Sequence, residues 1–414
     1  MNRRSATRRG QGRIIGALDI GSSKVACLIG QIDGSVGAGG RPLRVLGTGV
    51  QRSQGVKAGV ITDPQAAEAV VRAAVAQAER TSGVVLEEVF VSITCGRLRS
   101  LSFAAHADVS SKRVREADIA RILEGARAYA ERDGRVLVHM NRKGYRLDGA
   151  PGGDNPRGLA CGRLTADMHA VTADEGAVRN LMYVVERCDL TVAGLVAAPV
   201  ASALCVTSEE QRQLGVTVVD MGAGTTTLAV FEAGALAHCE VMLAGGHHLT
   251  FEIAQNLHAP LAEAERIKTL YASVVNAPSD FYDSFSFEGA GEGGERLHRE
   301  ARATLTGLVR PRVESLLREI ADRLDASGFN RGPVVLTGGA SQLAGLAGYA
   351  GLVLGRDVVA PAPQASLPAG GAALAATEGL LLAGAEGDLI EADRAAKGRA
   401  GYLGLVGRWV RGGL

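Results

Sequence analysis

The stretch VVDMGAGTTTLAVFEAG, residues 218–234, places an acid and a run of small residues between two apolar segments. Apolar, β-branched segments on either side of a glycine-containing turn predict a β-hairpin. The stretch ALDIGSSKVACLIGQID, residues 17–33, has the same outline, with Asp19 where the later stretch has Asp220. The two copies lie about two hundred residues apart, far beyond the period of a solenoid repeat. They therefore predict a duplicated domain and two lobes that face each other.

The composition is that of a folded protein with several parts. A chain of 414 residues is long enough for two or more domains. Lys and Arg number 45 and Asp and Glu number 44, so we expect no nucleic acid partner. The six cysteines lie far apart, without metal-binding spacing, and are expected to be reduced packing residues of a cytoplasmic protein. No stretch approaches the roughly 18 to 20 uninterrupted apolar residues of a membrane-spanning helix.

Strand patterns alternate with helical patterns along both halves, which predicts an α/β protein. From about residue 97 to residue 171 the pattern changes to short mixed segments and a loop, DGAPGGDNPRG, rich in Gly, Pro, Asp and Asn. We interpret residues 97–171 as an inserted subdomain.

The two turns have the composition of phosphate-binding loops. Phosphate groups require a close approach of backbone N–H groups, which small side chains allow, and hydroxyl groups add further donors. A carboxylate at the mouth of each turn, Asp19 or Asp220, can hold hydrated Mg²⁺ or orient a water molecule. Taken singly, each turn is equally well an ordinary hairpin with a glycine. The recurrence of the pattern, with a third small-residue turn at residues 337–341, favours a nucleotide clamp between two lobes.

The order of LDIGSSKV, VVDMGAGTTTLAVF and VVLTGGASQLAGL resembles the actin, Hsp70 and sugar-kinase superfamily, whose members bind ATP between two lobes. Within it, the chain resembles the FtsA family of bacterial cell-division proteins. The segments GVKAGVITDPQAAEAVVRAAVAQAE, NPRGLACGRL, VVERCDL, AGLVAAPVASAL and LAEAERIK carry this resemblance in family order. The resemblance covers about residues 14–379 and the extreme C-terminus.

The resemblance implies an actin-like, two-lobed, duplicated fold with an inserted subdomain and a C-terminal amphipathic helix. The predicted divisions are a disordered basic arm (1–12), a first lobe (13–96 and 172–212), the inserted subdomain (97–171), a second lobe (213–246 and 331–384) with its own subdomain (247–330), a linker (385–397) and a membrane-targeting helix (398–414).

The resemblance also implies the residues of an ATP and Mg²⁺ site. Asp19 and Asp220 take the Mg²⁺-water and hydrolytic-water roles, and Asp19 holds the metal through water. Glu265 and Lys268 are expected either to contact the ribose and adenine or to form an ordinary exposed pair. The nucleotide-binding residues implied by the motifs are Gly21, Ser22, Ser23, Lys24, Gly222, Ala223, Gly224, Thr225, Thr226, Gly338, Gly339, Ala340 and Ser341.

The chain departs from the family pattern in the second loop and after it. Residues 222–224 are Gly-Ala-Gly where three glycines are common, which is a mild change of one methyl group. His247 and His248 form an unusual histidine pair, for which local polar contacts are a better explanation than a metal. No further residue suggests a dedicated catalytic base, so we expect slow ATP hydrolysis and a mainly structural role for ATP.

The C-terminal segment KGRAGYLGLVGRWVRGGL is predicted to form a membrane-surface helix. On a helical wheel its apolar side chains cover one half, and its arginines and glycines take the other. The alternative is a terminal helix that docks on the protein itself. The residues expected to contact an anionic membrane are Tyr402, Leu403, Leu405, Val406, Arg408, Trp409, Val410 and Arg411.

By resemblance, the function is that of a protein that polymerises at the cytoplasmic face of the cell membrane, anchors the FtsZ ring at the division site and recruits the divisome. The C-terminal peptide of FtsZ is expected on residues 247–330, and other divisome proteins on the inserted subdomain. A small-molecule kinase and an actin-like pilus-assembly protein are alternatives, but neither accounts for the amphipathic tail. An Hsp70-like chaperone is a third alternative, against which no substrate-binding domain of adequate length is expected after the second lobe.

Overall fold

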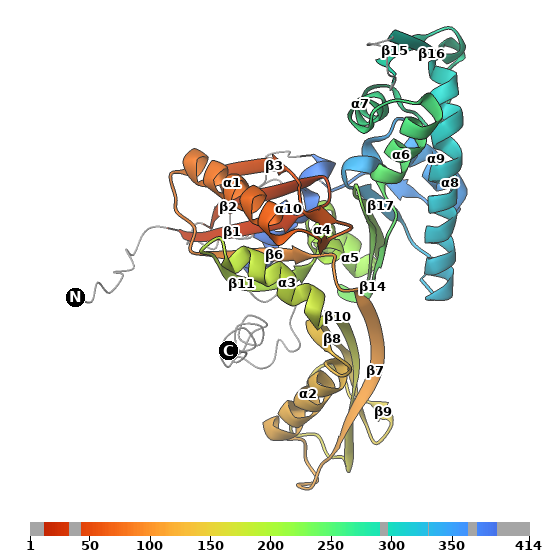
Figure 1. Cartoon of the computed structure of the whole chain (residues 1–414). Coiled ribbons are helices and arrows are strands. Elements are labelled where there is room, and N and C mark those ends of the chain that lie inside the picture. The colour runs from red at the N-terminus through yellow and green to blue at the C-terminus, as the bar shows by residue number, and fades with distance from the viewer. Residues whose placement is uncertain (1–11, 33–42, 290–296, 330, 363–370, 387–414) are drawn as a thin grey trace, which may run out of the picture.

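The structure is a computed structural model that describes residues 12–32, 43–289, 297–329, 331–362 and 371–386. Most of the predicted basic arm, nearly all of the predicted linker and the whole predicted membrane helix lie outside the described residues. Figure 1 shows a two-lobed body with one subdomain extending from each end. None of the helices in the described ranges combines the length and the apolar composition needed to cross a bilayer.

The first lobe contains a five-stranded mixed sheet with the order β11-β6-β1-β2-β3. Strands β1 and β2 form the predicted hairpin, and β6 pairs with β1 in parallel. Helix α1 (Pro64–Ser82) begins after Asp63, whose side chain accepts hydrogen bonds from the first free backbone N–H groups. Helix α3 (Glu175–Glu186) leads into the last strand of this sheet. The strands are β1 (Arg13–Ile20), β2 (Lys24–Ile32), β3 (Leu43–Arg52), β6 (Glu88–Ile93) and β11 (Thr191–Ala197), with a small separate hairpin of β4 (Val56–Lys57) and β5 (Val60–Ile61).

The second lobe repeats this arrangement in a sheet with the order β14-β13-β12-β17-β18. Its hairpin is formed by β12 and β13, and β17 pairs with β12 in parallel, as β6 does with β1. The duplicated α/β fold is therefore confirmed strand by strand. The strands are β12 (Val216–Met221), β13 (Thr226–Glu232), β14 (Ala235–Met242), β17 (Val334–Thr337) and β18 (Val358–Val359).

Two helices join the lobes by crossing between them. Helix α4 (Ala198–Val206) follows the last strand of the first sheet but packs on β12, β13 and β14 of the second. Helix α10 (Ala375–Glu386) comes from the second lobe but packs on β1, β2 and β6 of the first, and the two helices pack on each other. One continuous core of apolar side chains therefore includes residues of both sheets.

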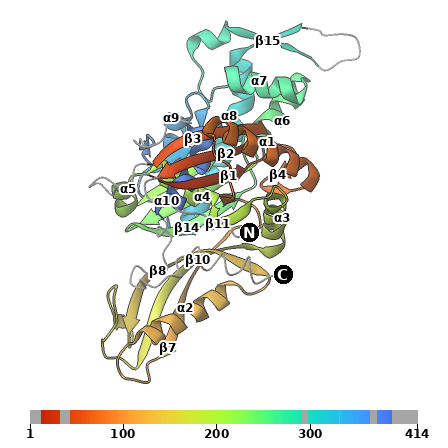
Figure 2. The same cartoon turned by 90° about the vertical axis from the view of Figure 1, so that its left-hand side faces the viewer.

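The inserted subdomain is a four-stranded antiparallel sheet with a helix on one face and its own apolar core. In Figures 1 and 2 it lies at the opposite end of the molecule from helix α7 and strand β15. At its root, Asn141 donates a hydrogen bond to Leu236 O (3.1 Å) and Ser100 Oγ accepts one from Cys239 N (3.1 Å), so it also contacts β14. Its elements are β7 (Arg99–Asp108), α2 (Glu116–Ala130), β8 (Arg135–Leu147), β9 (Ala150–Pro151) and β10 (Arg163–Asp174).

The remaining elements of the second lobe are mostly helical, and α6, α7, α8, α9 and β15 form a second apolar core with its sheet. All six cysteines lie in the described ranges, where each is buried and forms no disulfide, so their predicted packing role is confirmed. The elements are α5 (Glu209–Leu214), α6 (Gly246–Leu257), α7 (Leu261–Tyr271), η1 (Pro278–Phe281), β15 (Ser284–Glu288), β16 (Leu297–Ala301), α8 (Arg302–Ala326), η2 (Gly339–Gln342), α9 (Leu346–Leu354) and η3 (Ala372–Leu374).

Candidate nucleotide-binding site

The two hairpin turns are closed by the same backbone hydrogen bond. Gly21 N donates a hydrogen bond to Lys24 O (3.0 Å), and Gly222 N donates the matching one to Thr225 O (2.9 Å). The turns come from different lobes and meet: a Cβ atom added to Gly224 would lie only 2.5 Å from Ser22 Oγ. Only glycine permits this approach, because a Cβ atom there would overlap the facing turn.

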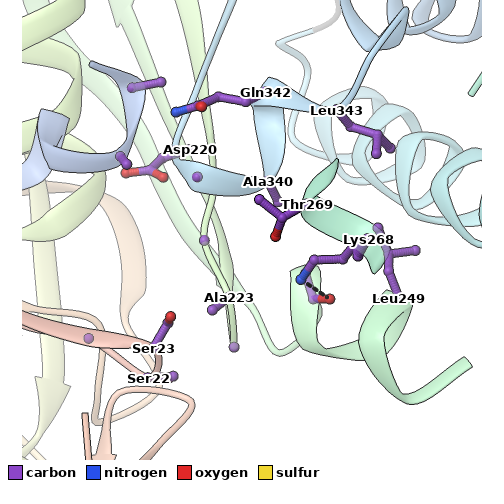
Figure 3. A pocket seen from close by; sticks show the side chains of 18 of the residues that line it. Ser22, Ser23, Asp220, Ala223, Leu249, Lys268, Thr269, Ala340, Gln342 and Leu343 are labelled. Atoms are coloured by element: carbon purple, nitrogen blue, oxygen red, sulfur yellow. Dashed lines mark hydrogen bonds between the residues drawn. The ribbon is translucent and has the colours of Figure 1, made fainter. Parts of the chain in front are cut away.

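Both turns line one cavity of about 410 Å³ between the lobes. In Figure 3, Ser22, Ser23 and Ala223 lie at one end of this cavity, and Leu249, Lys268 and Leu343 lie at the other. The structure thus brings together nearly all the predicted site residues. Those that line the cavity are Asp19, Gly21, Ser22, Ser23, Lys24, Asp220, Gly222, Ala223, Gly224, Thr225, Glu265, Lys268, Gly338, Gly339 and Ala340.

Two predicted residues do not line the cavity. Thr226 is fully buried, and its hydroxyl group donates to Ala244 O (2.8 Å). Ser341 donates to Gly338 O (2.7 Å) within the third turn, so its hydroxyl group stabilises the turn itself.

The carboxylates of Asp19 and Asp220 both line the cavity and influence each other electrostatically. Asp19 accepts a hydrogen bond from Ser92, and Asp220 accepts one from Ser202. Burial raises the pKa of both groups, that of Asp220 to about 6, although the two serines and Lys24 act in the opposite direction. Burial lowers the pKa of Lys24 against the attraction of both carboxylates. At this end of the cavity the Lys24 ammonium group therefore attracts two carboxylates that ionise less readily than usual.

The predicted pair Glu265 and Lys268 is not an ordinary exposed pair, because the Lys268 side chain is only 13% exposed. Lys268 Nζ donates to Glu265 (2.6 Å), to Thr250 Oγ1 (2.9 Å) and to Gly246 O (3.1 Å). Burial opposes ionisation of Glu265, but hydrogen bonds from Lys268 and Thr250 outweigh it and lower its pKa. The pair thus ties helix α7 to helix α6 at the end of the cavity far from the hairpin turns.

Several residues of the site were not predicted. Ser92 and Ser202 approach the carboxylates from β6 and α4, and no local sequence signal marks either one. Thr227 lines the cavity and lies directly opposite Asp220 in the hairpin, a position that strand register could have indicated. Other unpredicted polar lining residues are Thr94, Thr269, Ser273, Arg302 and Gln342.

The donor set fits a hydrated Mg²⁺ ion better than a metal enclosed by protein ligands. Over the described ranges, no group of three or more His, Cys, Asp or Glu side chains is arranged to hold a metal ion. Mg²⁺ keeps most of its waters and needs only one or two carboxylates, which Asp19 and Asp220 can supply. His248 Nδ1 accepts a hydrogen bond from Gly245 N (3.2 Å) at the start of α6, a local polar contact of the kind expected for the histidine pair.

Comparisons with known proteins agree with this geometry. The family described as "Cell division protein FtsA" matches residues 217–379, and "SHS2 domain inserted in FTSA" matches residues 95–172. The Cell division protein FtsA of Agrobacterium fabrum is 37% identical over 418 residues, which cover 96% of this chain and 94% of that protein. The chain belongs to the FtsA family. The FtsA proteins of Pseudomonas aeruginosa and Escherichia coli K12 are 33% and 30% identical, over 81% and 85% of this chain and 79% and 84% of their own lengths.

Solved structures show the same fold at low sequence identity. A chain of the PilM-PilN type IV pilus biogenesis complex has a TM-score of 0.64 and 17% identity, with 90% of this chain and 98% of that chain covered. MreB5 of Spiroplasma citri bound to AMPPNP has a TM-score of 0.53 and 12% identity, with 90% and 96% covered. The chain is thus an actin-like cell-division protein of the FtsA family with the predicted insertion, and the kinase and pilus alternatives have less support.

Proposed function

We propose that this FtsA-family protein binds Mg²⁺-ATP between its lobes, polymerises on the cytoplasmic face of the cell membrane and anchors the FtsZ ring at the division site. The observation that supports nucleotide binding best is the meeting of two matched acidic turns around one cavity. A cavity of about 410 Å³ is within the usual range for small-molecule sites.

The cavity suggests how the nucleotide would lie. The turns at residues 21–24 and 222–225 would surround the phosphate groups, because their small side chains leave backbone N–H groups accessible. Lys24 would neutralise part of the phosphate charge. The ribose and adenine would lie toward Glu265 and Lys268, next to the small residues 338–340, where a larger side chain would intrude.

Asp19 would hold Mg²⁺ through water, and the ion would neutralise charge on the phosphates when bound. Asp220 would accept a proton from the water that attacks the terminal phosphate. Its raised pKa suits a proton acceptor near neutral pH. We expect slow hydrolysis, so that ATP serves mainly to hold the lobes together.

The membrane and protein partners are proposed from the resemblance and from exposed side chains. Phe251, Phe281 and Tyr282 are 57%, 64% and 89% exposed in the region predicted to dock the FtsZ peptide. Exposed aromatic side chains are enriched in protein interfaces. A single amphipathic tail (residues 398–414) would bind lipid weakly, and many tails on one filament would bind it tightly.

The test uses the purified full-length protein and a variant that lacks residues 398–414. With Mg²⁺-ATP, the full chain should form filaments on vesicles that contain anionic lipid. The truncated variant should bind ATP with unchanged affinity but should not sediment with the vesicles. Absence of ATP binding would contradict the proposed site, and lipid binding by the truncated variant would contradict the proposed tail. Vesicles without anionic lipid serve as the control for electrostatic attraction.

A further inference from the structure

The two hairpins match closely but differ at one position that faces the ligand cavity. In the first hairpin Asp19 lies opposite Ala26, and in the second Asp220 lies opposite Thr227. Each partner follows its aspartate at the same interval along the chain. Residues directly opposite in antiparallel strands share one face of the sheet, with Cβ atoms about 4.5 to 5.5 Å apart. The second carboxylate therefore has a neighbouring hydroxyl group, and the first has a methyl group in its place.

The Thr227 hydroxyl group is a buried donor and acceptor without a partner. Thr227 is 3% exposed, and its Oγ1 atom makes no hydrogen bond to any atom of the described residues. Native proteins seldom leave such a group unpaired, because a buried polar group without a hydrogen bond has lost its contacts with water. The preceding Thr226 makes the contrast clear, because it points to the other face and donates to Ala244 O.

The position of Thr227 indicates what its partner is. Thr227 and Asp220 both line the cavity at the second phosphate turn, and one oxygen of Asp220 is already bonded to Ser202. The Thr227 Oγ1 atom is buried in the structure, and a change of χ1 to another staggered rotamer would exchange the hydroxyl and methyl groups at the cavity wall. A water molecule between the Asp220 carboxylate and the Thr227 hydroxyl would satisfy both groups.

We propose that Thr227 is a catalytic residue of ATP hydrolysis, which together with Asp220 holds the attacking water in line with the terminal phosphate. This inference rests on the proposed ATP site. In the step, the water oxygen forms a bond to the γ-phosphorus, and the bond from that phosphorus to the β–γ bridging oxygen breaks. The bridging oxygen leaves with ADP, and the water proton passes to the Asp220 carboxylate. The Thr227 hydroxyl orients the water and exchanges no proton with it.

The experiment compares Thr227→Val with the wild-type full-length chain. Valine has nearly the same shape but no hydroxyl group, so the attacking water loses one of its two protein contacts. We expect the single-turnover hydrolysis rate with Mg²⁺-ATP to fall roughly a hundredfold, which is the lower end of the loss found when a positioned donor is removed. Because ATP itself does not contact this hydroxyl group, its dissociation constant should stay within about twofold. Thr227→Ser, which keeps the hydroxyl group, should recover most of the rate.

Thr377→Val is the matched control. Thr377 is fully buried in α10, and its hydroxyl group also has no partner among the described residues, but it does not line the cavity. Thr377→Val, which removes this hydroxyl group, should leave the hydrolysis rate and the ATP affinity unchanged. A rate change in Thr377→Val as large as that in Thr227→Val would show a general effect of removing a buried hydroxyl group and would overturn the assignment.

A second measurement does not depend on turnover. The complex of ADP with aluminium fluoride imitates the transferring phosphoryl group and its in-line water. Thr227→Val should therefore weaken the binding of this complex by about the same factor by which it lowers the hydrolysis rate, while the affinity for ADP alone should not change. If Thr227→Val lowered the hydrolysis rate and the ATP affinity by the same factor, the Thr227 hydroxyl group would contact a phosphate group of ATP, and the water-holding role would be refuted. Wild-type rates in Thr227→Val would also refute it while leaving the ATP site intact. Failure of the wild-type chain to bind ATP would instead refute the proposed function.

Discussion

Replacement of Gly379 by alanine should separate the two helices that join the lobes. Gly379 lies on α10 where it crosses α4, and an added Cβ atom would lie 1.7 Å from Ala201 O and 2.4 Å from Ala201 C. Non-bonded carbon atoms need about 3.5 Å or more, so the helices would have to move apart by roughly 1.5 Å. Both clashing atoms belong to the backbone of α4, so no side-chain rotation can relieve the contact.

The magnitude follows from two opposing effects. Overpacking in a well-packed core costs about 1 to 3 kcal/mol, and the rigid backbone partner places Gly379→Ala at the upper end of that range. Alanine in a helix interior recovers about 1 kcal/mol relative to glycine. The expected net loss in the free energy of unfolding is therefore about 2 kcal/mol. Ser202, which donates to Asp220, also lies on α4, so ATP affinity should fall as well.

The assay is urea unfolding followed by circular dichroism, with Gly307→Ala as the control. Gly307 lies inside α8, and an added Cβ atom there would meet nothing within 4 Å. That variant should gain about 0.5 to 1 kcal/mol from helix propensity alone. Equal stability of Gly379→Ala and Gly307→Ala would refute the argument that the helix crossing depends on the absence of a side chain.

Three further predictions concern protonation and nucleotide contacts. Hydrolysis should be lost as the pH falls through the Asp220 pKa of about 6, because the protonated carboxyl group cannot accept a proton. Ser202→Ala removes a hydrogen bond that lowers this pKa, so it should move the acid limb of the pH–rate profile to higher pH. An acid limb that does not move would exclude Asp220 as the proton acceptor. Burial lowers the pKa of His139 and of His169 to about 3, so the unfolded chain binds protons that the folded protein does not, and stability falls as the pH drops below about 6.5. At about pH 5.5 each histidine should lower the free energy of unfolding by about 1.4 kcal/mol. The measurement compares the pH dependence of unfolding in the wild type and in a His139→Gln/His169→Asn variant, and the contribution of Asp220 cancels because both proteins contain it. Lys268→Met should weaken ATP binding about tenfold in calorimetry, because it removes the cation that ties α6 to α7 at the cavity; an unchanged affinity would place the nucleotide elsewhere.

Much of the site could be predicted from the sequence because its main parts are local. An acid at the end of a strand, a glycine turn and a second strand lie within residues 19–32 and again within residues 220–232, so short-range patterns determine each hairpin. Their repetition revealed the duplication, and the third small-residue turn lines the same cavity. Thr226 and Ser341 were included from the motifs, but neither lines the cavity, and the hydroxyl group of each donates to a backbone carbonyl group. Alternate strand residues face opposite sides of a sheet, and turn hydroxyl groups can cap their own turn.

Local residue patterns were sufficient to predict the paired hairpins, the α/β layers, the position of the insertion and the resemblance to the FtsA family. Three features became known only from the fold: which hydroxyl groups meet the two carboxylates, the crossing of α4 and α10 between the sheets, and the hydrogen bonds from the root of the insertion to β14. Those contacts join residues far apart in the chain, and they depend on strand register and helix packing, which local residue patterns do not encode. The burial that raises the pKa of Asp220 likewise depends on segments that are distant in the chain, such as α4, which packs on β12.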